Sequence, residues 1–320
     1  MSPLDRLKRA FGLAAAVPQP EDQVGLGGRE HRTLLEEMNA DLPPGVDWTA
    51  GAHSYVAAEF SKYGEGYTHY LLTKPFSPVG PGEPGRQART ENLHYFTNFA
   101  NAFALLDLPG DAAVLDVACG SGWVSQFFAR MAYPVHAFDL CIDMVDLTRL
   151  RLRQDAQLAG LHAELDERIF QLDIERQTLP PSLIGHFGAV ILESCLHHFM
   201  DPVTALSHLA DGLSADGLVL IIEGENRKGP LNPDYIKVMN DFNTLERPYT
   251  RDQLKRALCL AGLPHHCFLG RLNGWFTADD PSLPHLVERI QADTEALNFA
   301  ICARTPEALR RVVPHYSGVS

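Results

Sequence analysis

The sequence lacks the features that mark several protein classes. No apolar run among its 320 residues reaches the 18 or so positions that a membrane-spanning helix needs. Its six cysteines are scattered without any CxxC spacing, mostly in apolar segments, which is typical of reduced, buried thiols and indicates a cytoplasmic protein. Basic residues are also few. With 27 Lys and Arg against 40 Asp and Glu, the net charge of -13 argues against a general affinity for nucleic acid or anionic membranes, although a local basic patch stays open.

What remains is an ordinary globular composition, with 45% hydrophobic and 21% charged residues and no internal repeat. Near the N-terminus, basic residues precede a short apolar run over residues 10–17, which loosely resembles a signal peptide. We expect an amphipathic helix there instead, because the run is short and the rest of the chain has a cytosolic character. Residues 18–28 are expected to form a linker or loop.

The chain changes its pattern near residue 108. Residues 29–108 are mainly helical, with helices expected around residues 34–39, 49–63 and 88–106. Beyond this point strands and helices alternate, which predicts an α/β domain with a doubly wound, mostly parallel sheet covered by helices on both faces. We therefore expect an N-terminal segment over residues 1–28, a helical cover and substrate region over 29–108, and a sheet domain over 109–320 with an insertion near 224–250.

The apolar strands of the sheet domain end in acids. The strands are expected at residues 113–117, 134–138, 168–172, 187–192 and 218–222, with two more near 267–272 and 298–303. The acids that close the first five are Asp116, Asp139, Asp173, Glu193 and Glu223. Ligands of parallel sheets bind outside the carboxyl ends of the strands. The recurrence therefore predicts an acid-lined rim that faces a cationic or hydroxyl-rich ligand.

The segment AVLDVACGSG, residues 113–122, is the most informative stretch. A dinucleotide-binding turn needs GxGxxG, whereas here Ala118, Gly120 and Gly122 are followed by no third glycine. Asp116, two residues before the turn, would repel a pyrophosphate but attract an ammonium group. A ligand with an amino acid at one end and a nucleoside at the other fits better, and S-adenosylmethionine is such a ligand.

VLDVACGSG resembles motif I of the class I S-adenosylmethionine-dependent methyltransferases. The resemblance covers roughly residues 111–304, with VHAFDL, FQLDIERQTLP, AVILESCLHHFMDP and YTRDQLKRALCLAGL in the family's order. It implies a seven-stranded sheet, an N-terminal helical cover and S-adenosylmethionine as cofactor.

The resemblance also implies roles for single residues. Asp116 would lie near the methionine ammonium, Asp139 would hold the ribose hydroxyls, and Asp173 would contact the adenine amino group. The full predicted set of cofactor-binding residues is Asp116, Ala118, Gly120, Ser121, Gly122, Asp139, Leu140, Met144, Asp173, Ile174, Glu193 and Ser194.

A hydroxyl acceptor needs a base. His198 in the HHF run is the first candidate and His197 the second, with Glu193 close to the reacting groups; the alternative is that an imidazole only binds backbone at the strand end. Metal ions are not expected, because the sequence shows no tight ligand pattern. The predicted acceptor contacts are Tyr67, Tyr70, His94, Glu223 and Asn226.

Methyltransferases of this fold that act on amino groups of bases or glutamine usually carry [D/N]PP[Y/F] after the fourth strand, where this chain reads ESCL. The sequence therefore predicts methyl transfer to a small molecule and not to nucleic acid. Oxygen is the favoured acceptor atom, in a sugar-containing metabolite, a polyketide or a phenol. Nitrogen or carbon methylation, a non-catalytic binding module and an NAD-dependent oxidoreductase are the alternatives. The oligomeric state is open, with a homodimer as one option.

Overall fold

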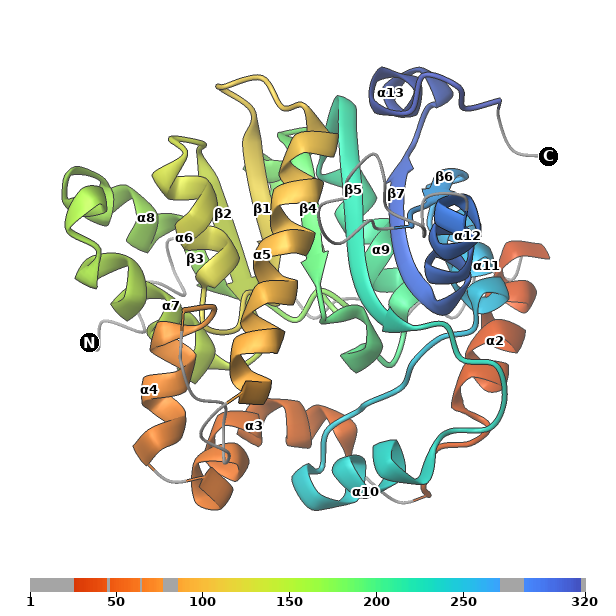
Figure 1. The fold of residues 1–320 in the computed structure, drawn as a ribbon, viewed down its shortest axis with the longest axis horizontal. Helices are drawn as coiled ribbons and strands as arrows, with labels where there is room; N and C mark the ends of the chain where they lie inside the picture. The colour runs from red at the N-terminus through yellow and green to blue at the C-terminus, as the bar shows by residue number, and fades with distance from the viewer. Residues whose placement is uncertain (1–25, 45–46, 64, 77–85, 271–284, 318–320) are drawn as a thin grey trace.

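The computed structural model describes residues 26–44, 47–63, 65–76, 86–270 and 285–317. Within these ranges the strands form one seven-stranded sheet in the order β3-β2-β1-β4-β5-β7-β6 (Figure 1). The strands are β1 (Ala113–Val117), β2 (Val135–Asp139), β3 (Ile169–Gln171), β4 (Phe187–Glu193), β5 (Leu213–Glu225), β6 (His265–Phe268) and β7 (Leu297–Ala303). All neighbouring pairs are parallel except those of β7, which runs antiparallel to β5 and β6. The predicted mostly parallel sheet is confirmed.

Successive side chains of a strand point to opposite faces of the sheet, and both faces are buried here. Val114 packs into a core with α5 (Arg86–Leu106), α6 (Trp123–Arg130), α7 (Ile142–Gln154), α8 (His162–Arg168) and α13 (Pro306–Val312). Leu115 packs into the opposite core with α2 (Leu26–Asn39), α9 (Pro202–Asp211) and α11 (Arg251–Leu260). The sheet is therefore doubly wound, as the alternating pattern predicts.

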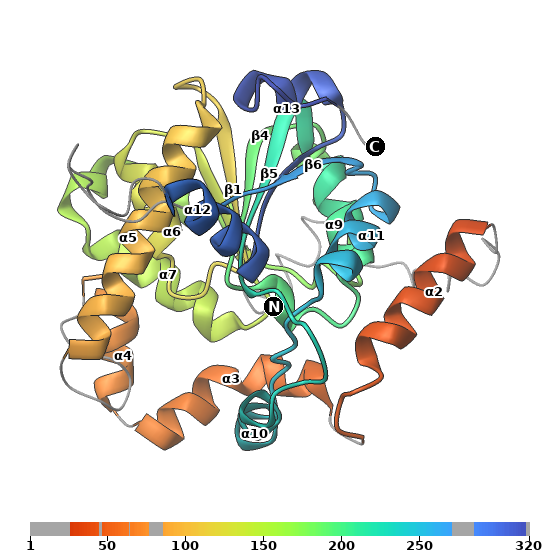
Figure 2. The same ribbon diagram turned by 45° about the vertical axis from the view of Figure 1, so that its right-hand side comes forward.

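Three further helices lie at the carboxyl ends of the strands: α3 (Trp48–Tyr63), α4 (Glu65–Thr73) and α10 (Pro233–Phe242) (Figures 1 and 2). Tyr70 and Leu71 of α4 pack on Cys141 and Met144 at the start of α7. On the other side, Trp48 packs in one cluster with residues of α10. This layer covers the edge of the sheet at which ligands are expected.

Some elements differ from the sequence predictions. The sequence pattern after the second strand predicts one helix over residues 142–159, closed by Gly160. In the structure this helix ends at Gln154, because the buried carboxylate of Asp155 accepts hydrogen bonds from Arg130 and Gln126 and caps a 3₁₀ turn, η1 (Ala156–Leu161). Helices α4, α8, α10, α12 (Leu286–Ala296) and α13 were not predicted. The linker expected over residues 18–28 is wrong at its end, because α2 already begins at Leu26. The rest of that linker and the amphipathic helix expected before it lie outside the described residues, and the division into domains stays a prediction.

In the part of the chain that the structure describes, no helix is both long and apolar enough to cross a bilayer. All six cysteines are free thiols; Cys259 is exposed and Cys267 partly buried, while the others are buried, as expected for reduced cysteines in apolar segments.

Candidate active site

A cavity of about 610 Å³ lies at the carboxyl ends of β1, β2 and β4, beneath the covering helices. This volume is within the usual range for small-molecule sites. The turn after β1 and the residues after β2, β3 and β4 form its floor, while α3, α4 and α5 contribute the opposite wall. β1 is also where the strand order reverses, so the cavity is at the topological switch point of the sheet.

The turn after β1 needs unusual backbone angles. Ala118, Gly120 and Gly122 all have positive φ, at 48°, 53° and 72°. At Gly122 a Cβ atom would lie 2.5 Å from Cγ2 of Thr148, whose hydroxyl donates a hydrogen bond to the carbonyl oxygen of Gly120 at 2.8 Å. Only glycine fits at position 122, whereas Ala118 occupies the left-handed region at a cost of about 1–2 kcal/mol.

Gly122→Ala is expected to destabilise the protein more than Gly120→Ala. Both substitutions incur the left-handed backbone cost of about 1–2 kcal/mol. Gly122→Ala adds a clash with Thr148, worth about another 1–3 kcal/mol, whereas the nearest atom to a Cβ at Gly120 is 4.0 Å away. Urea denaturation measures the free energy of unfolding of both variants. Equal losses would contradict the close packing of Gly122 on α7.

Asp139 holds this turn against the next helix. One carboxylate oxygen accepts a hydrogen bond from the amide of Gly120 at 3.0 Å, and the other accepts one from the amide of Cys141 at 2.8 Å. Burial raises the pKa of Asp139 to about 6, although the backbone hydrogen bonds oppose the shift. Each oxygen keeps further acceptor capacity toward the cavity that Asp139 lines. The arrangement suits a ligand with two neighbouring hydroxyl groups.

Asp116 is absent from the cavity lining and lies behind the wall. Its carboxylate accepts hydrogen bonds from the amide of Ser125 at 3.0 Å and from the hydroxyl of Ser125 at 2.6 Å, and so holds the first turn of α6. Burial raises the pKa of Asp116 to about 7. That Asp116 interacts with the cofactor ammonium, directly or through water, stays a prediction. Gly122 is likewise absent from the lining and serves the turn.

The other predicted cofactor residues come together. The cavity is lined by Ala118, Gly120, Ser121, Asp139, Leu140, Met144, Asp173, Ile174, Glu193 and Ser194. Asp173 forms a turn by accepting a hydrogen bond from the amide of Glu175 at 3.2 Å, which directs the chain after β3 along the cavity. That these side chains bind a cofactor stays a prediction.

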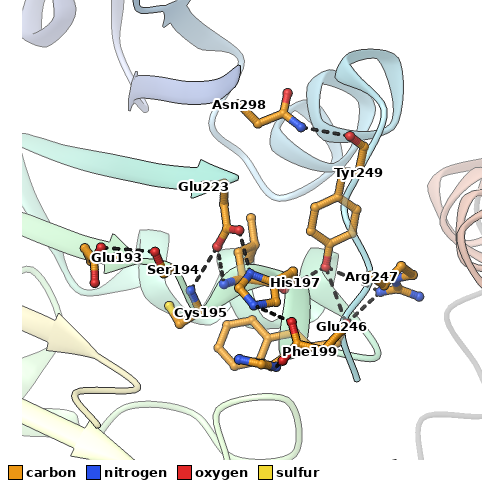
Figure 3. Close-up of polar contacts among 12 residues, drawn as sticks. Glu193, Ser194, Cys195, His197, Phe199, Glu223, Glu246, Arg247, Tyr249 and Asn298 are labelled. Carbon is orange, nitrogen blue, oxygen red and sulfur yellow. Dashed lines mark hydrogen bonds and ion pairs between the residues drawn. The ribbon is translucent and has the colours of Figure 1, made fainter. Parts of the chain in front are cut away.

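His197 lies between two carboxylates (Figure 3). It belongs to η3 (Leu196–His198), directly after β4. Its Nδ1 is 2.7 Å from Glu223 and its Nε2 is 3.3 Å from Glu246. Glu223 also accepts hydrogen bonds from the amides of Cys195 and Leu196. Burial alone would lower the pKa of His197, but the two carboxylates outweigh it and raise the pKa to about 10. His197 is therefore an imidazolium with both nitrogens engaged, and it is a poor base.

His198 has the opposite character. Its Nδ1 is 2.5 Å from the carbonyl oxygen of Leu245, which can only accept, so Nδ1 carries the proton and Nε2 carries the lone pair. Burial and the neighbouring charge of His197 lower the pKa of His198. The side chain lines the cavity. Of the two predicted bases, His198 is the one that the geometry supports.

Glu193, the third predicted catalytic residue, lies on the same wall. Its carboxylate accepts a hydrogen bond from the hydroxyl of Ser194 at 3.0 Å. Burial raises its pKa, and the ammonium of Lys74 opposes this shift. Glu193 thus offers a buried carboxylate to the same cavity that His198 lines.

His197, His198 and Glu246 place ligand atoms within 4.8 Å of one another, a spacing that a metal ion could use. His197 lies between Glu223 and Glu246, and these carboxylates raise its pKa to about 10, which favours a proton on the imidazole over a metal ion. That the site holds no metal ion stays a prediction.

The predicted acceptor contacts are only partly brought together. Tyr70 lines the cavity, whereas Glu223 faces His197 from behind the wall and acts as its positioning partner. Asn226 is a correction. Its amide donates to the carbonyl of Glu295 and accepts from the amide of Arg251, so it joins the end of β5 to α11 and α12. The side chains of Tyr67 and His94 lie outside those that the structure describes.

Sequence reasoning missed Glu246 and Tyr55. Glu246 holds His197 from a segment without periodic pattern, and Tyr55 of α3 lines the cavity with its ring centre 6.3 Å from that of His198. No local signal marks either residue, because each acts through a partner far away in the chain.

Comparison with known proteins adds independent information. A family model described as "Methyltransferase domain" matches residues 87–265, which is more than half of the chain. A ubiquinone biosynthesis O-methyltransferase of Xanthomonas campestris pv. campestris is 29% identical over 151 residues, covering 47% of this chain and 56% of that protein. An uncharacterized methyltransferase of Mycobacterium bovis is 35% identical over 135 residues, covering 41% and 58%. The chain thus spans about half the length of the curated relatives it matches.

Among solved structures, a geranyl diphosphate C-methyltransferase from Streptomyces coelicolor aligns with a TM-score of 0.44 at 14% identity. The alignment covers 76% of this chain and 98% of that one.

Proposed function

The chain belongs to the methyltransferase-domain family, as its resemblance to class I S-adenosylmethionine-dependent methyltransferases predicts, and we propose that it methylates a hydroxyl group of a small molecule. The reaction takes place in the cavity between the glycine turn and His198. S-adenosylmethionine, when bound, supplies a methyl group on a sulfonium that is susceptible to in-line displacement.

The observation that carries the proposal is the 2.5 Å contact of His198 Nδ1 with the carbonyl oxygen of Leu245, at the wall of the cavity. A neutral imidazole with its proton fixed on Nδ1 and its lone pair on Nε2 is the form that a general base requires. Amines that are neutral at the working pH need no such base, so a prepared base on the cavity wall favours an oxygen acceptor.

The residues present fit the cofactor. Asp139 offers two carboxylate oxygens to a pair of hydroxyls, and the left-handed turn at Gly120 brings bare backbone to the wall. Leu140 and Met144 provide an apolar surface for the adenine ring. The nucleoside part of the cofactor thereby meets polar groups for its ribose and an apolar surface for its adenine.

In the proposed reaction Nε2 of His198 accepts the hydroxyl proton as the acceptor oxygen forms its bond to the methyl carbon. The bond from that carbon to sulfur breaks, and its electron pair stays on sulfur. Holding the two reactants in line contributes most to the rate, with well-aligned intramolecular systems gaining about 7–11 kcal/mol. His197, fixed by Glu223 and Glu246, keeps η3 and hence His198 in place.

The acceptor wall favours an aromatic hydroxyl. Trp48, Tyr55, Tyr70, Tyr95 and Phe199 all line the cavity, and flat aromatic surfaces pack well on a planar ring. The name of the Xanthomonas relative, a ubiquinone biosynthesis O-methyltransferase, supports oxygen as the acceptor atom. We therefore rank phenols above sugars as the proposed methyl acceptors.

Incubation with methyl-labelled S-adenosylmethionine and a panel of phenols, catechols, sugars and aromatic amines tests the proposal. We expect label in an ether of a phenol or catechol. Label only in amines or on carbon would replace the proposal by nitrogen or carbon methylation. Tight cofactor binding without transfer to any fraction of a cell extract would favour a binding module.

A further inference from the structure

The end of α4 is tied to the glycine turn by one buried guanidinium. Arg151 of α7 is 4% exposed. It donates a hydrogen bond to the carbonyl of Leu71 at 2.8 Å and to the carbonyl of Ser121 at 3.2 Å, and it also donates to the carbonyl of Lys74. Arg151 therefore binds both the end of α4 and the turn after β1. This holds the backbone of Lys74 beside that turn.

The side chain of Lys74 points to the same place. Lys74 lines the cavity, and its Nζ lies 4.1 Å from the centre of the Tyr95 ring. That ring in turn packs on Trp123, the first residue of α6, with ring centres 5.5 Å apart. Lys74 therefore lies over the segment in which the turn passes into α6.

The ammonium of Lys74 differs from the other charged groups of the cavity wall in its position. Among the described residues of the lining, the Lys and Arg side chains are Lys74 and Arg176. Arg176 lies 3.7 Å from Asp173, on the segment after β3. Lys74 is thus the cation beside the turn, where the wall otherwise offers the carboxylates of Asp139 and Glu193.

We propose that Lys74 binds the carboxylate of the amino-acid end of the cofactor, so that the covering helix α4 forms part of the cofactor site. This inference rests on the proposed function. It assigns the end of α4, at Lys74, to the cofactor and leaves Tyr70, α3 and the residues around His198 to the acceptor. Arg151 acts through Lys74 and Ser121 as a positioning residue.

Isothermal titration of two ligands tests the proposal. S-adenosylhomocysteine carries the amino-acid end, whereas 5′-methylthioadenosine shares the nucleoside and lacks that end. Lys74→Met is expected to lower the affinity for S-adenosylhomocysteine by at least about tenfold, the usual effect of losing a hydrogen bond to a charged group. The affinity for methylthioadenosine should stay unchanged. Lys74→Arg is expected to retain most of the affinity. Lys237→Met, which removes an exposed lysine of α10, is the matched control and should change neither affinity.

Unchanged binding of S-adenosylhomocysteine by Lys74→Met would overturn the assignment, and so would a parallel loss of both ligands. A raised KM for the acceptor with unchanged S-adenosylhomocysteine binding would move Lys74 to the acceptor site. If the wild-type protein binds neither ligand, the proposed function itself fails, which is a different result from a selective failure at Lys74.

Discussion

His198→Asn is expected to lower kcat by about 10²- to 10⁴-fold, the usual contribution of a general base. Asparagine can still donate a hydrogen bond to the carbonyl of Leu245, so η3 should keep its position, but it offers no lone pair that can take a proton. The dissociation constant of S-adenosylhomocysteine should change little. Steady-state kinetics and calorimetry on the same preparation separate the two effects.

The pH profile of the wild-type protein gives a second readout for His198. The base must be neutral, so kcat/KM for the acceptor, measured with saturating S-adenosylmethionine so that Asp139 does not contribute, is expected to rise with pH and level off. The inflection should lie below the ordinary histidine pKa of 6.5, because burial and the charge of His197 lower the pKa of His198. In His198→Asn this acid limb should disappear. His265→Asn, on the edge strand β6, is the control and should keep both rate and profile. An unchanged rate in His198→Asn would remove this residue from the mechanism.

Asp139→Asn is expected to lower the affinity for S-adenosylhomocysteine by about 10- to 100-fold. The substitution keeps the shape but replaces one acceptor oxygen by an amide donor, which would face either the amide of Gly120 or that of Cys141. Hydrogen bonds to a charged group are worth about 1.5–3 kcal/mol each, which sets the size of the loss. Calorimetric titration measures it.

Binding should also depend on pH through Asp139. Burial raises its pKa to about 6, and only the ionised carboxylate accepts hydrogen bonds on both oxygens, so the affinity for S-adenosylhomocysteine is expected to fall as the pH drops through this value. Asp166→Asn, which removes an ion-pair partner of Arg153, is the matched control and should keep the affinity of the wild-type protein and its pH dependence. Equal affinity of Asp139→Asn and wild type would mean that Asp139 serves only the turn.

The sheet could be predicted well because short sequence patterns mark its strands and its first turn. An apolar strand that ends in an acid, as at Asp139, and a turn that requires left-handed residues, as at Gly122, are visible in a few consecutive letters. The order of such segments along the chain then fixes the alternation of strands and helices. Helix α4 was missed, because glycine and aromatic density hide a short helix whose stability comes from packing on α7.

The site was only partly predictable because its polar groups take their roles from distant partners. Asp116 has the residue type and place of a cofactor ligand, yet Ser125 engages its carboxylate inside the domain. The sequence ranks His198 before His197 as a base but does not show that the two imidazoles differ in charge. Glu246 makes one of them an imidazolium and Leu245 fixes the tautomer of the other, and both come from a segment after α10 that carries no motif.

The central claim is that the cavity at the carboxyl ends of β1, β2 and β4 binds S-adenosylmethionine. Calorimetric titration of the wild-type protein with S-adenosylhomocysteine and, separately, with NADH tests it most directly. The account predicts saturable binding of S-adenosylhomocysteine and none of NADH. Binding of NADH without binding of S-adenosylhomocysteine would contradict it.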